Sequence, residues 1–219
     1  MDKKIREIQK SGGEKLKEKM LKTIEGYKSL SEEDKNCLHV YYGYGKGKTT
    51  SVIGLIIRAL GAGKKVALVQ FDKGYSEGNE HYSERIILRK LIELGYPLEL
   101  YPTGCERMNN DGTFRFVNGK EDFDEAKRGL DIATRLIKEG SQNLLVLDEV
   151  IAAVAYNLLK KSDVEELIIE YKKRKKFELI MTGHKIWDYL RENADLITEM
   201  RKEKHYFDKG ITAREGIEF

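Results

Sequence analysis

The sequence predicts an α/β protein in which helices cover both faces of a mostly parallel β-sheet. Short apolar segments alternate along the chain with longer segments whose apolar residues recur every three or four positions. One short segment, residues 66–71, is a nearly continuous apolar run, which is typical of a strand buried on both faces of a parallel sheet. A glycine-rich loop connects the first short segment to a helix. Together these observations favour repeated strand–helix units.

Residues 1–36 form a compositional zone of their own. We expect residues 1–13, which are polar, to be frayed. Between Glu14 and Leu30 the apolar residues recur at spacings of three and four, which predicts an amphipathic helix: Leu16, Met20, Leu21, Ile24 and Tyr27. Two roles remain open for this helix. It packs on the main domain, or it acts as a lid or binds a partner. The rest of the chain, residues 37–219, is long enough for one domain with a sizeable core.

The glycine-rich loop follows the first predicted strand, residues 37–42, and opens a helix over residues 49–60. Such a loop surrounds a phosphate with backbone N–H groups and the positive end of the helix. The triplet from Gly47 to Thr49 matches the end of a Walker A loop, in which the lysine reaches phosphate oxygens and the threonine holds Mg²⁺. A full Walker A loop has glycine five positions before Gly47, where this chain has Tyr42. The loop is therefore a P-loop with shifted glycines, and we predict that ATP binds to Gly43, Tyr44, Gly45, Lys46, Gly47, Lys48, Thr49 and Thr50.

Further strand and helix signals alternate after the P-loop, as expected for repeated crossover units. The remaining predicted strands are residues 66–71, 98–101, 144–149, 177–182 and 196–200. The spacing of apolar residues predicts a helix over residues 121–138. Residues 102–120 contain three glycines and read as a long irregular loop, and such loops in compact domains are often functional.

Polar residues follow three of the predicted strands: the P-loop, the pair Asp148-Glu149, and the triplet from Thr182 to His184. Ligands of such sheets bind at the carboxyl ends of the strands. An apolar strand that ends in Asp-Glu is typical of a Walker B segment, whose carboxylate holds Mg²⁺ directly or through water. We therefore assign Asp148, together with Thr49, to Mg²⁺. Glu149 is expected to bind ribose hydroxyls, to orient a water molecule or to transfer a proton.

Composition excludes several classes of protein. The 40 basic and 37 acidic residues nearly balance, so there is no electrostatic case for a nucleic-acid-binding protein. The two cysteines, Cys37 and Cys105, lie far apart without the spacing of metal ligands, and we expect reduced thiols in a reducing cytosol. No apolar run approaches the length of a membrane span, and the first residues are too charged for a signal peptide. We therefore expect a cytoplasmic protein.

The P-loop resembles the G-x-G-K-G-K-T-T signature of the ATP:corrinoid (cob(I)alamin) adenosyltransferases, whose fold is similar to that of RecA. The resemblance extends in collinear order over residues 37–219, and the N-terminal amphipathic helix also has a counterpart in the family. Further similar segments read VQF-x-KG at 69–74, VLDE at 146–149, ADLITEM at 194–200, KHYFD-x-G at 204–210 and GIEF at 216–219. The resemblance implies a RecA-like P-loop NTPase fold with three layers.

The resemblance also implies a reaction. The family transfers the 5′-deoxyadenosyl group of ATP to Co(I) of a corrinoid and releases triphosphate, in adenosylcobalamin biosynthesis or salvage. Lys46, Lys48 and Mg²⁺ on Thr49 would stabilise the charge that develops on the triphosphate. Glu149 resembles the family residue that contacts the ribose, and Arg58 the one near the nucleotide. Co(I) is itself a strong nucleophile, so no general base is required.

The resemblance further implies an electron-donating flavoprotein or reductase as partner, a homodimer, and a flap role over the corrinoid for the N-terminal helix. Tyr44, inside the P-loop, is placed to stack on adenine or on a corrin ring.

Two segments depart from the family pattern. The family generally carries Gly-Phe-x-Trp in the loop after the third strand, where the aromatic residues help to strip the lower axial ligand from cobalt. This chain has Thr-Gly-Cys-Glu-Arg-Met at residues 103–108, and we identify as candidate corrinoid-loop residues Cys105, Arg107, Phe114 and Phe116. Second, many relatives have Thr-Gly-Arg where this chain has His184 as the third residue. We expect His184 to contact ATP as a weaker or pH-dependent cation.

Two other functions remain open. A P-loop ATPase or kinase would cleave ATP at the γ-phosphate and would produce ADP instead of triphosphate. A regulator that binds ATP and a corrinoid without turnover would form no cobalt–carbon bond.

Overall fold

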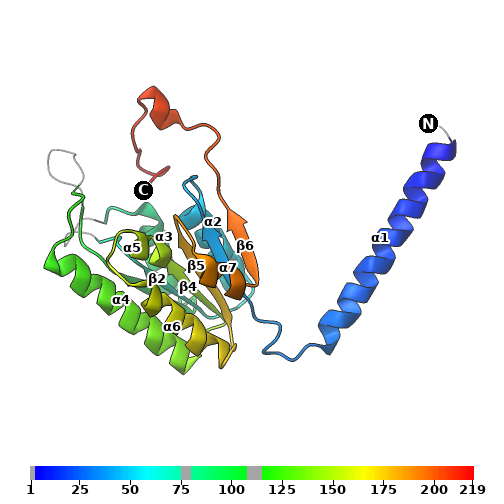
Figure 1. Ribbon diagram of the computed structural model, residues 1–219, viewed down its shortest axis with the longest axis horizontal. Helices are drawn as coiled ribbons and strands as arrows, with labels where there is room; N and C mark the ends of the chain where they lie inside the picture. The colour runs from blue at the N-terminus through cyan, green and yellow to red at the C-terminus, as the bar shows by residue number, and fades with distance from the viewer. Residues whose placement is uncertain (1–2, 75–79, 108–114) are drawn as a thin grey trace. The chain divides into compact units, whose positions relative to one another are not determined.

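The computed structural model describes residues 3–74, 80–107 and 115–219, with side chains from residue 12 onward. Two compact units make up the chain, Met1–Lys35 and Asn36–Phe219. Figure 1 shows the helices and strands of each unit. Within the described residues there is no helix both long enough and apolar enough to cross a membrane.

The first unit is built on one helix, α1 (Lys3–Ser29). The expectation that residues 1–13 are frayed is wrong from Lys3 onward. Lysine, glutamate and glutamine have high helix propensity, and the helix continues through Gly12 and Gly13 although glycine costs about 1 kcal/mol at such positions. The apolar residues that predicted the helix are between 46% and 60% exposed: Leu16, Met20, Leu21, Ile24 and Tyr27.

The second unit contains a six-stranded sheet in the order β3-β2-β4-β5-β1-β6. Its strands are β1 (Leu38–Tyr42), β2 (Val66–Gln70), β3 (Leu98–Pro102), β4 (Leu144–Asp148), β5 (Glu178–Gly183) and β6 (Leu196–Glu199). Every pair of neighbouring strands is parallel. The predicted fold class is thus confirmed, and the nearly continuous apolar run at residues 66–71 forms a strand, β2, that is buried at every position.

Helices cover both faces of this sheet because successive residues of each strand point to opposite sides. Val66 and Leu68 of β2 belong to one core, which also contains residues of α2 (Lys48–Gly61) and α3 (Ser83–Glu93). Ala67 and Val69 belong to the core on the other face. That core contains residues of α4 (Lys120–Glu139), α5 (Val150–Ala155), α6 (Lys161–Lys172) and α7 (Asp188–Asn193). Figure 1 shows α4 and α6 side by side on this face.

The order of the strands brings four connecting segments to one edge of the sheet. Strands β1, β5, β4 and β2 are consecutive neighbours, and their carboxyl ends meet there. The P-loop follows β1, His184 follows β5, Glu149 follows β4, and Lys73 lies three residues beyond β2. These segments are far apart in the sequence but adjacent in the fold.

Candidate active site

The glycines of the P-loop are explained by backbone geometry and by a close neighbour. Gly43 and Gly47 have φ angles of 119° and 115°, a region that favours glycine. The backbone at Met200, just after β6, packs directly on the loop, and Met200 O accepts a hydrogen bond of 2.8 Å from Gly45 N. A side chain at Gly43 or Gly45 would collide with this backbone. The close approach of the Met200 backbone therefore explains why positions 43 and 45 of this loop are glycines.

Lys48 is the buried cation of the P-loop. Only 7% of this residue is exposed, and its Nζ donates to Gly43 O at 2.9 Å and to Gly45 O at 3.3 Å. Lys48 is also the first residue of α2, whose first turn contains no acidic side chain. The ammonium and the positive end of the helix dipole therefore act on the same space above the loop, as anion binding requires.

The second lysine of the loop, Lys46, contacts a segment much later in the chain. Its Nζ lies 2.5 Å from Glu218 Oε1 and 2.9 Å from the hydroxyl of Tyr206, and it donates to Ile217 O at 2.8 Å. Tyr206 begins the short 3-10 helix η1 (Tyr206–Lys209). We refer to residues 206–219 as the C-terminal segment.

Asp148 is the centre of a buried polar cluster. Its carboxylate accepts hydrogen bonds from Thr49 Oγ1 at 3.1 Å and from Thr182 Oγ1 at 2.7 Å, and Lys73 Nζ lies 2.7 Å away. Lys73 also donates to Thr49 Oγ1 at 2.7 Å. Burial raises the pKa of Asp148, but the Lys73 ammonium and the hydrogen bonds from Lys73, Thr182 and Thr49 outweigh it and leave the pKa below its usual range. Asp148 is thus a carboxylate.

Glu149 differs from Asp148 in its environment. Its backbone has a left-handed conformation, with φ of 61°, and its N–H donates to Thr182 Oγ1 at 2.7 Å. Its Oε2 atom is buried and has no hydrogen-bond partner among the described residues. Burial and the nearby charge of Asp148 raise the pKa of Glu149, although Lys73 and Lys48 oppose the shift. A buried carboxyl oxygen without a donor indicates a place where a ligand can donate.

His184 lies between two tyrosines. The ring of Tyr44 stacks on it with centroids 5.5 Å apart and an interplanar angle of 16°. Tyr156 OH lies 3.2 Å from His184 Nδ1. Burial and the Lys48 ammonium lower the pKa of His184, so the imidazole is neutral at pH 7. The ring therefore acts first as a stacking and hydrogen-bonding group.

Two cavities, each of about 550 Å³, meet at Lys73 and Tyr82. The first, which we call the phosphate-side cavity, is also lined by Thr49, Thr50 and the end of the C-terminal segment, residues 216–219. The second, which we call the aromatic cavity, is lined by Lys73, Tyr82, Phe116, Glu149, Tyr156 and His184. A molecule with a charged and an aromatic part therefore has a matching place at this edge of the sheet.

The structure divides the candidate residues of the loop after β3. Arg107 and Phe116 line the aromatic cavity, and Arg107 Nε donates to Asp72 Oδ1 at 2.7 Å. Cys105 lines a different cavity of about 1150 Å³. Burial, Asp122 and Glu125 raise the pKa of the Cys105 thiol to about 11, which keeps it protonated. Phe114 lies outside the described residues.

Arg58 does not join the other predicted site residues. It lies in the last turn of α2 and is exposed. With a rise of 1.5 Å per residue, it is about 15 Å along the helix from Lys48. Its contact with a nucleotide stays a prediction.

Several residues of this edge have no role predicted from the sequence, although some lie within segments that resemble the family. The main ones are Lys73, Tyr82, Thr182, Tyr206 and Glu218. Lys73 had a usable signal, because it follows the buried strand β2, and a polar residue just after such a strand lies at the ligand edge. No local sequence pattern indicates Glu218, because its contact with Lys46 joins residues 172 positions apart.

Comparisons with known proteins agree with this geometry. The family model described as ATP:corrinoid adenosyltransferase BtuR/CobO/CobP matches residues 34–219. The chain is 30% identical over 207 residues to a corrinoid adenosyltransferase of Escherichia coli K12, covering 94% of this chain and 95% of that protein. It is 31% identical over 189 residues to a corrinoid adenosyltransferase of Sinorhizobium sp., covering 85% of this chain and 82% of that protein. It is also 29% identical over 204 residues to the corrinoid adenosyltransferase CobA of Salmonella typhimurium, covering 92% and 95% respectively.

Proposed function

Because this chain belongs to the ATP:corrinoid adenosyltransferase family and is an enzyme of that class, we propose that it transfers the 5′-deoxyadenosyl group of ATP to Co(I) of a corrinoid and releases triphosphate. The observation that carries the proposal is the junction of the phosphate-side cavity and the aromatic cavity at Lys73 and Tyr82. This junction offers one place for a triphosphate and an adjoining place for the adenosyl group and the cobalt.

The leaving group is a polyanion, so the protein must stabilise negative charge as the bond from C5′ to oxygen breaks. Lys48 and the start of α2 supply positive charge at the P-loop. Lys46 adds a second ammonium once its contact with Glu218 is exchanged for phosphate. Such preorganised charges act most strongly where water is excluded. In this proposal Lys46 and Lys48 are catalytic because they touch the leaving group.

Thr49 and Asp148 fit a magnesium ion that accompanies the triphosphate. A hydroxyl and a carboxylate 3.1 Å apart are hard oxygen donors of the kind that Mg²⁺ prefers. Mg²⁺ would supply further charge stabilisation on the phosphate oxygens. Lys73 now contacts both oxygens, and we infer that its ammonium moves toward the phosphates when the ion binds.

Glu149 is proposed to hold the ribose. In the part of the chain that the structure describes, no group donates to its buried Oε2 atom, and a ribose hydroxyl would supply a donor. Because the same side chain lines the aromatic cavity, this hydrogen bond would direct C5′ toward that cavity. Tyr82, Tyr156 and Phe116 would exclude water from the reacting atoms.

The test mixes the protein with Mg-ATP and chemically reduced Co(I) corrinoid, anaerobically and in the dark. A light-sensitive adenosylcorrinoid together with inorganic triphosphate is the expected product pair. Lys48→Ala should abolish it, whereas Lys90→Ala, which changes an exposed lysine on α3, should not. ADP in place of triphosphate would instead identify cleavage at the γ-phosphate. Binding of ATP and corrinoid without either product would identify a non-catalytic regulator.

Several expectations from the sequence stay predictions. They are an electron-donating flavoprotein or reductase as partner, a homodimer, a cytoplasmic location and a flap role for α1. The flap role is tested by deletion of residues 1–30, and unchanged corrinoid affinity would contradict it. Light scattering of the purified chain tests the homodimer.

A further inference from the structure

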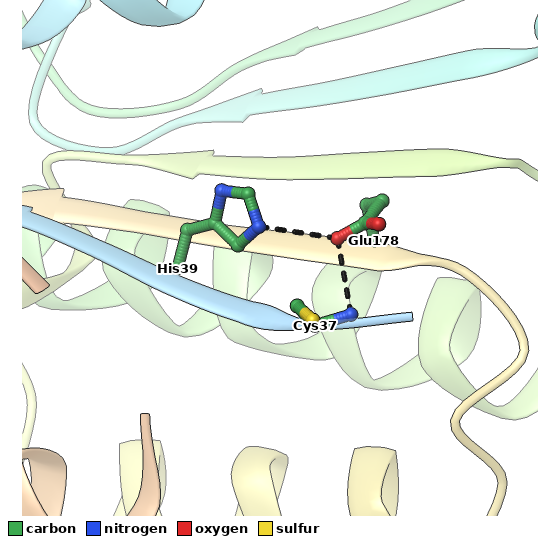
Figure 2. Close-up of side chains that lie close together, drawn as sticks. All are labelled: Cys37, His39 and Glu178. Atoms are coloured by element: carbon green, nitrogen blue, oxygen red, sulfur yellow. Dashed lines mark hydrogen bonds and ion pairs between the residues drawn. The ribbon is translucent and has the colours of Figure 1, made fainter. Parts of the chain in front are cut away.

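Cys37, His39 and Glu178 lie together at the edge of the sheet opposite the candidate active site. Cys37 precedes β1, His39 is its second residue, and Glu178 begins β5. Strands β1 and β5 pair in parallel with Leu38 opposite Leu179, so all three residues are at amino ends of strands. Figure 2 shows the thiol, the imidazole and the carboxylate close together. One ligand atom from each lies within 4.8 Å of the other two.

Contacts within the cluster already hold part of this arrangement. Glu178 Oε2 lies 3.2 Å from His39 Nε2 and accepts a hydrogen bond of 3.0 Å from Cys37 N. Residues two apart in an extended chain point to the same face, so the side chains of Cys37 and His39 both lie near the Glu178 carboxylate. The side chains of His39 and Glu178 are 20% and 37% exposed. The cluster is therefore shielded but open to a small ion.

Charges around the cluster favour a cation. Besides Glu178, a second carboxylate, that of Asp195, lies at the amino end of β1. Asp195 is tied to the same place, because its Oδ2 accepts a hydrogen bond of 2.8 Å from Leu38 N. Lys175 Nζ is 3.8 Å from that oxygen. His39 Nδ1 is buried and has no hydrogen-bond partner among the described residues.

We propose that Cys37, His39 and Glu178 bind a zinc-type divalent cation. A thiolate, an imidazole and a carboxylate form a donor set suited to Zn²⁺, which also prefers four ligands in a tetrahedron. Three protein ligands leave one position for water. The three donor atoms must draw together by roughly 1 Å to reach ordinary zinc distances, and side-chain rotation at the partly exposed strand ends allows this. The site cannot be recognised from residue spacing in the sequence, because Cys37 and Glu178 are 141 positions apart.

Binding would join the amino ends of β1 and β5 through the ion. The Cys37 sulfur gives up its proton as it binds the metal, so one proton is released to the buffer and no electron is transferred. A cation bound only by the folded chain also stabilises it. The alternative is a simple hydrogen bond between Glu178 and His39 that binds no metal.

The test uses the untagged full chain, freed of metal, and Co²⁺ as a spectroscopic probe. We expect a thiolate-to-cobalt charge-transfer band in the near ultraviolet and intense visible bands of tetrahedral cobalt, both removed by one equivalent of Zn²⁺. Zn²⁺ should also raise the unfolding temperature. Titration calorimetry in buffers of different ionisation enthalpy should report the released proton.

Cys37→Ser should remove the charge-transfer band, and His39→Gln and Glu178→Gln should each weaken Zn²⁺ binding at least tenfold. Cys105→Ser is the matched control and should keep the band. Circular dichroism checks that each variant is folded. If Glu178→Gln does not fold, the Zn²⁺ affinity of His39→Gln tests the proposal in its place. Absence of the band from the unchanged protein, or its persistence in Cys37→Ser, would overturn the proposal.

Discussion

Lys46 Nζ lies 2.5 Å from Glu218 Oε1, which ties the P-loop to the C-terminal segment. Tyr206 contributes to the same contact, because its hydroxyl donates to Glu218. Hydrogen bonds from Lys46, Tyr206 and Arg214 lower the pKa of Glu218 to about 2, so Glu218 is a carboxylate at every physiological pH. A triphosphate that needs Lys46 must therefore compete with a fixed negative charge.

Glu218→Gln should tighten ATP binding, because Lys46 is then released more easily. The Lys46 and Glu218 side chains are 36% and 16% exposed, and such a partly exposed ion pair contributes little, so we expect an increase of about 2- to 5-fold in affinity. Calorimetry with ATP measures it, and Glu203→Gln, a change at an exposed residue, is the control. Weaker binding would show instead that Glu218 holds Lys46 in place for the nucleotide.

Lys73→Met should destabilise the fold strongly. The side chain of Asp148 is 0% exposed, and loss of Lys73 would leave its charge buried without a cation. Loss of one partner from a buried pair costs about 3–5 kcal/mol, and urea unfolding measures this. Lys65→Met, which breaks a partly exposed pair with Glu99, should cost at most about 1 kcal/mol. If both variants unfold at the same urea concentration, the buried pair of Lys73 and Asp148 does not contribute more to the free energy of unfolding than the partly exposed pair.

His184→Arg should strengthen ATP binding and change its pH dependence. Burial and Lys48 lower the pKa of His184, so its positive charge is present only in acid and is lost as pH rises through that lowered value. An arginine stays charged at all of these pH values. ATP affinity measured from about pH 5 to 8 should rise in acid for the unchanged protein and be flatter for the variant. Weaker binding by the variant would indicate that stacking on Tyr44 outweighs charge.

Asp122→Asn should remove part of the acid dependence of stability. Hydrogen bonds from Arg115 are the main cause that lowers the pKa of Asp122 to about 2, with help from Gly119 N and Arg107. Because the folded pKa is below the unfolded value, the stabilisation is fully present above about pH 4 and is lost as pH falls through about 2. The side chain of Asp122 is 1% exposed, and the contribution is on the order of 2 kcal/mol.

Urea unfolding at several acidic pH values follows this contribution. The stability curve of Asp122→Asn should be flatter than that of the unchanged protein between about pH 4 and 2. Asp124→Asn is the control, because Asp124 is exposed in the same turn of α4. Parallel curves for the unchanged protein and Asp122→Asn would contradict the prediction.

Phe116→Ala should impair the use of the corrinoid and leave ATP binding unchanged. Phe116 is 86% exposed and lines the aromatic cavity, where the ring can contact a flat ligand. Loss of one aromatic contact should lower kcat/KM for the corrinoid about 2- to 10-fold. Val117→Ala, at the exposed neighbouring residue, is the matched control. An equal loss in both variants would point to a general effect on the loop.

Strand positions were predicted from the sequence to within one or two residues at either end. Local information suffices there, because apolar runs and glycines decide where strands begin and end. The start of α1 was missed, since polar residues that favour a helix give no periodic apolar signal between residues 3 and 13. The P-loop and the pair Asp148-Glu149 could be predicted as site residues from the sequence, because the pattern that indicates each of them lies in residues next to each other in the chain.

The sequence by itself determined the fold class, the position of the glycine-rich loop after β1 and the family. It could not show that Met200 packs on Gly43 and Gly45, that Lys73 joins Asp148, or that Glu218 competes for Lys46. It also could not show that Cys37 and His39 lie beside Glu178. Only the tertiary structure decided these contacts, because each joins segments from 75 to 172 positions apart, and the order of strands in the sheet places them side by side.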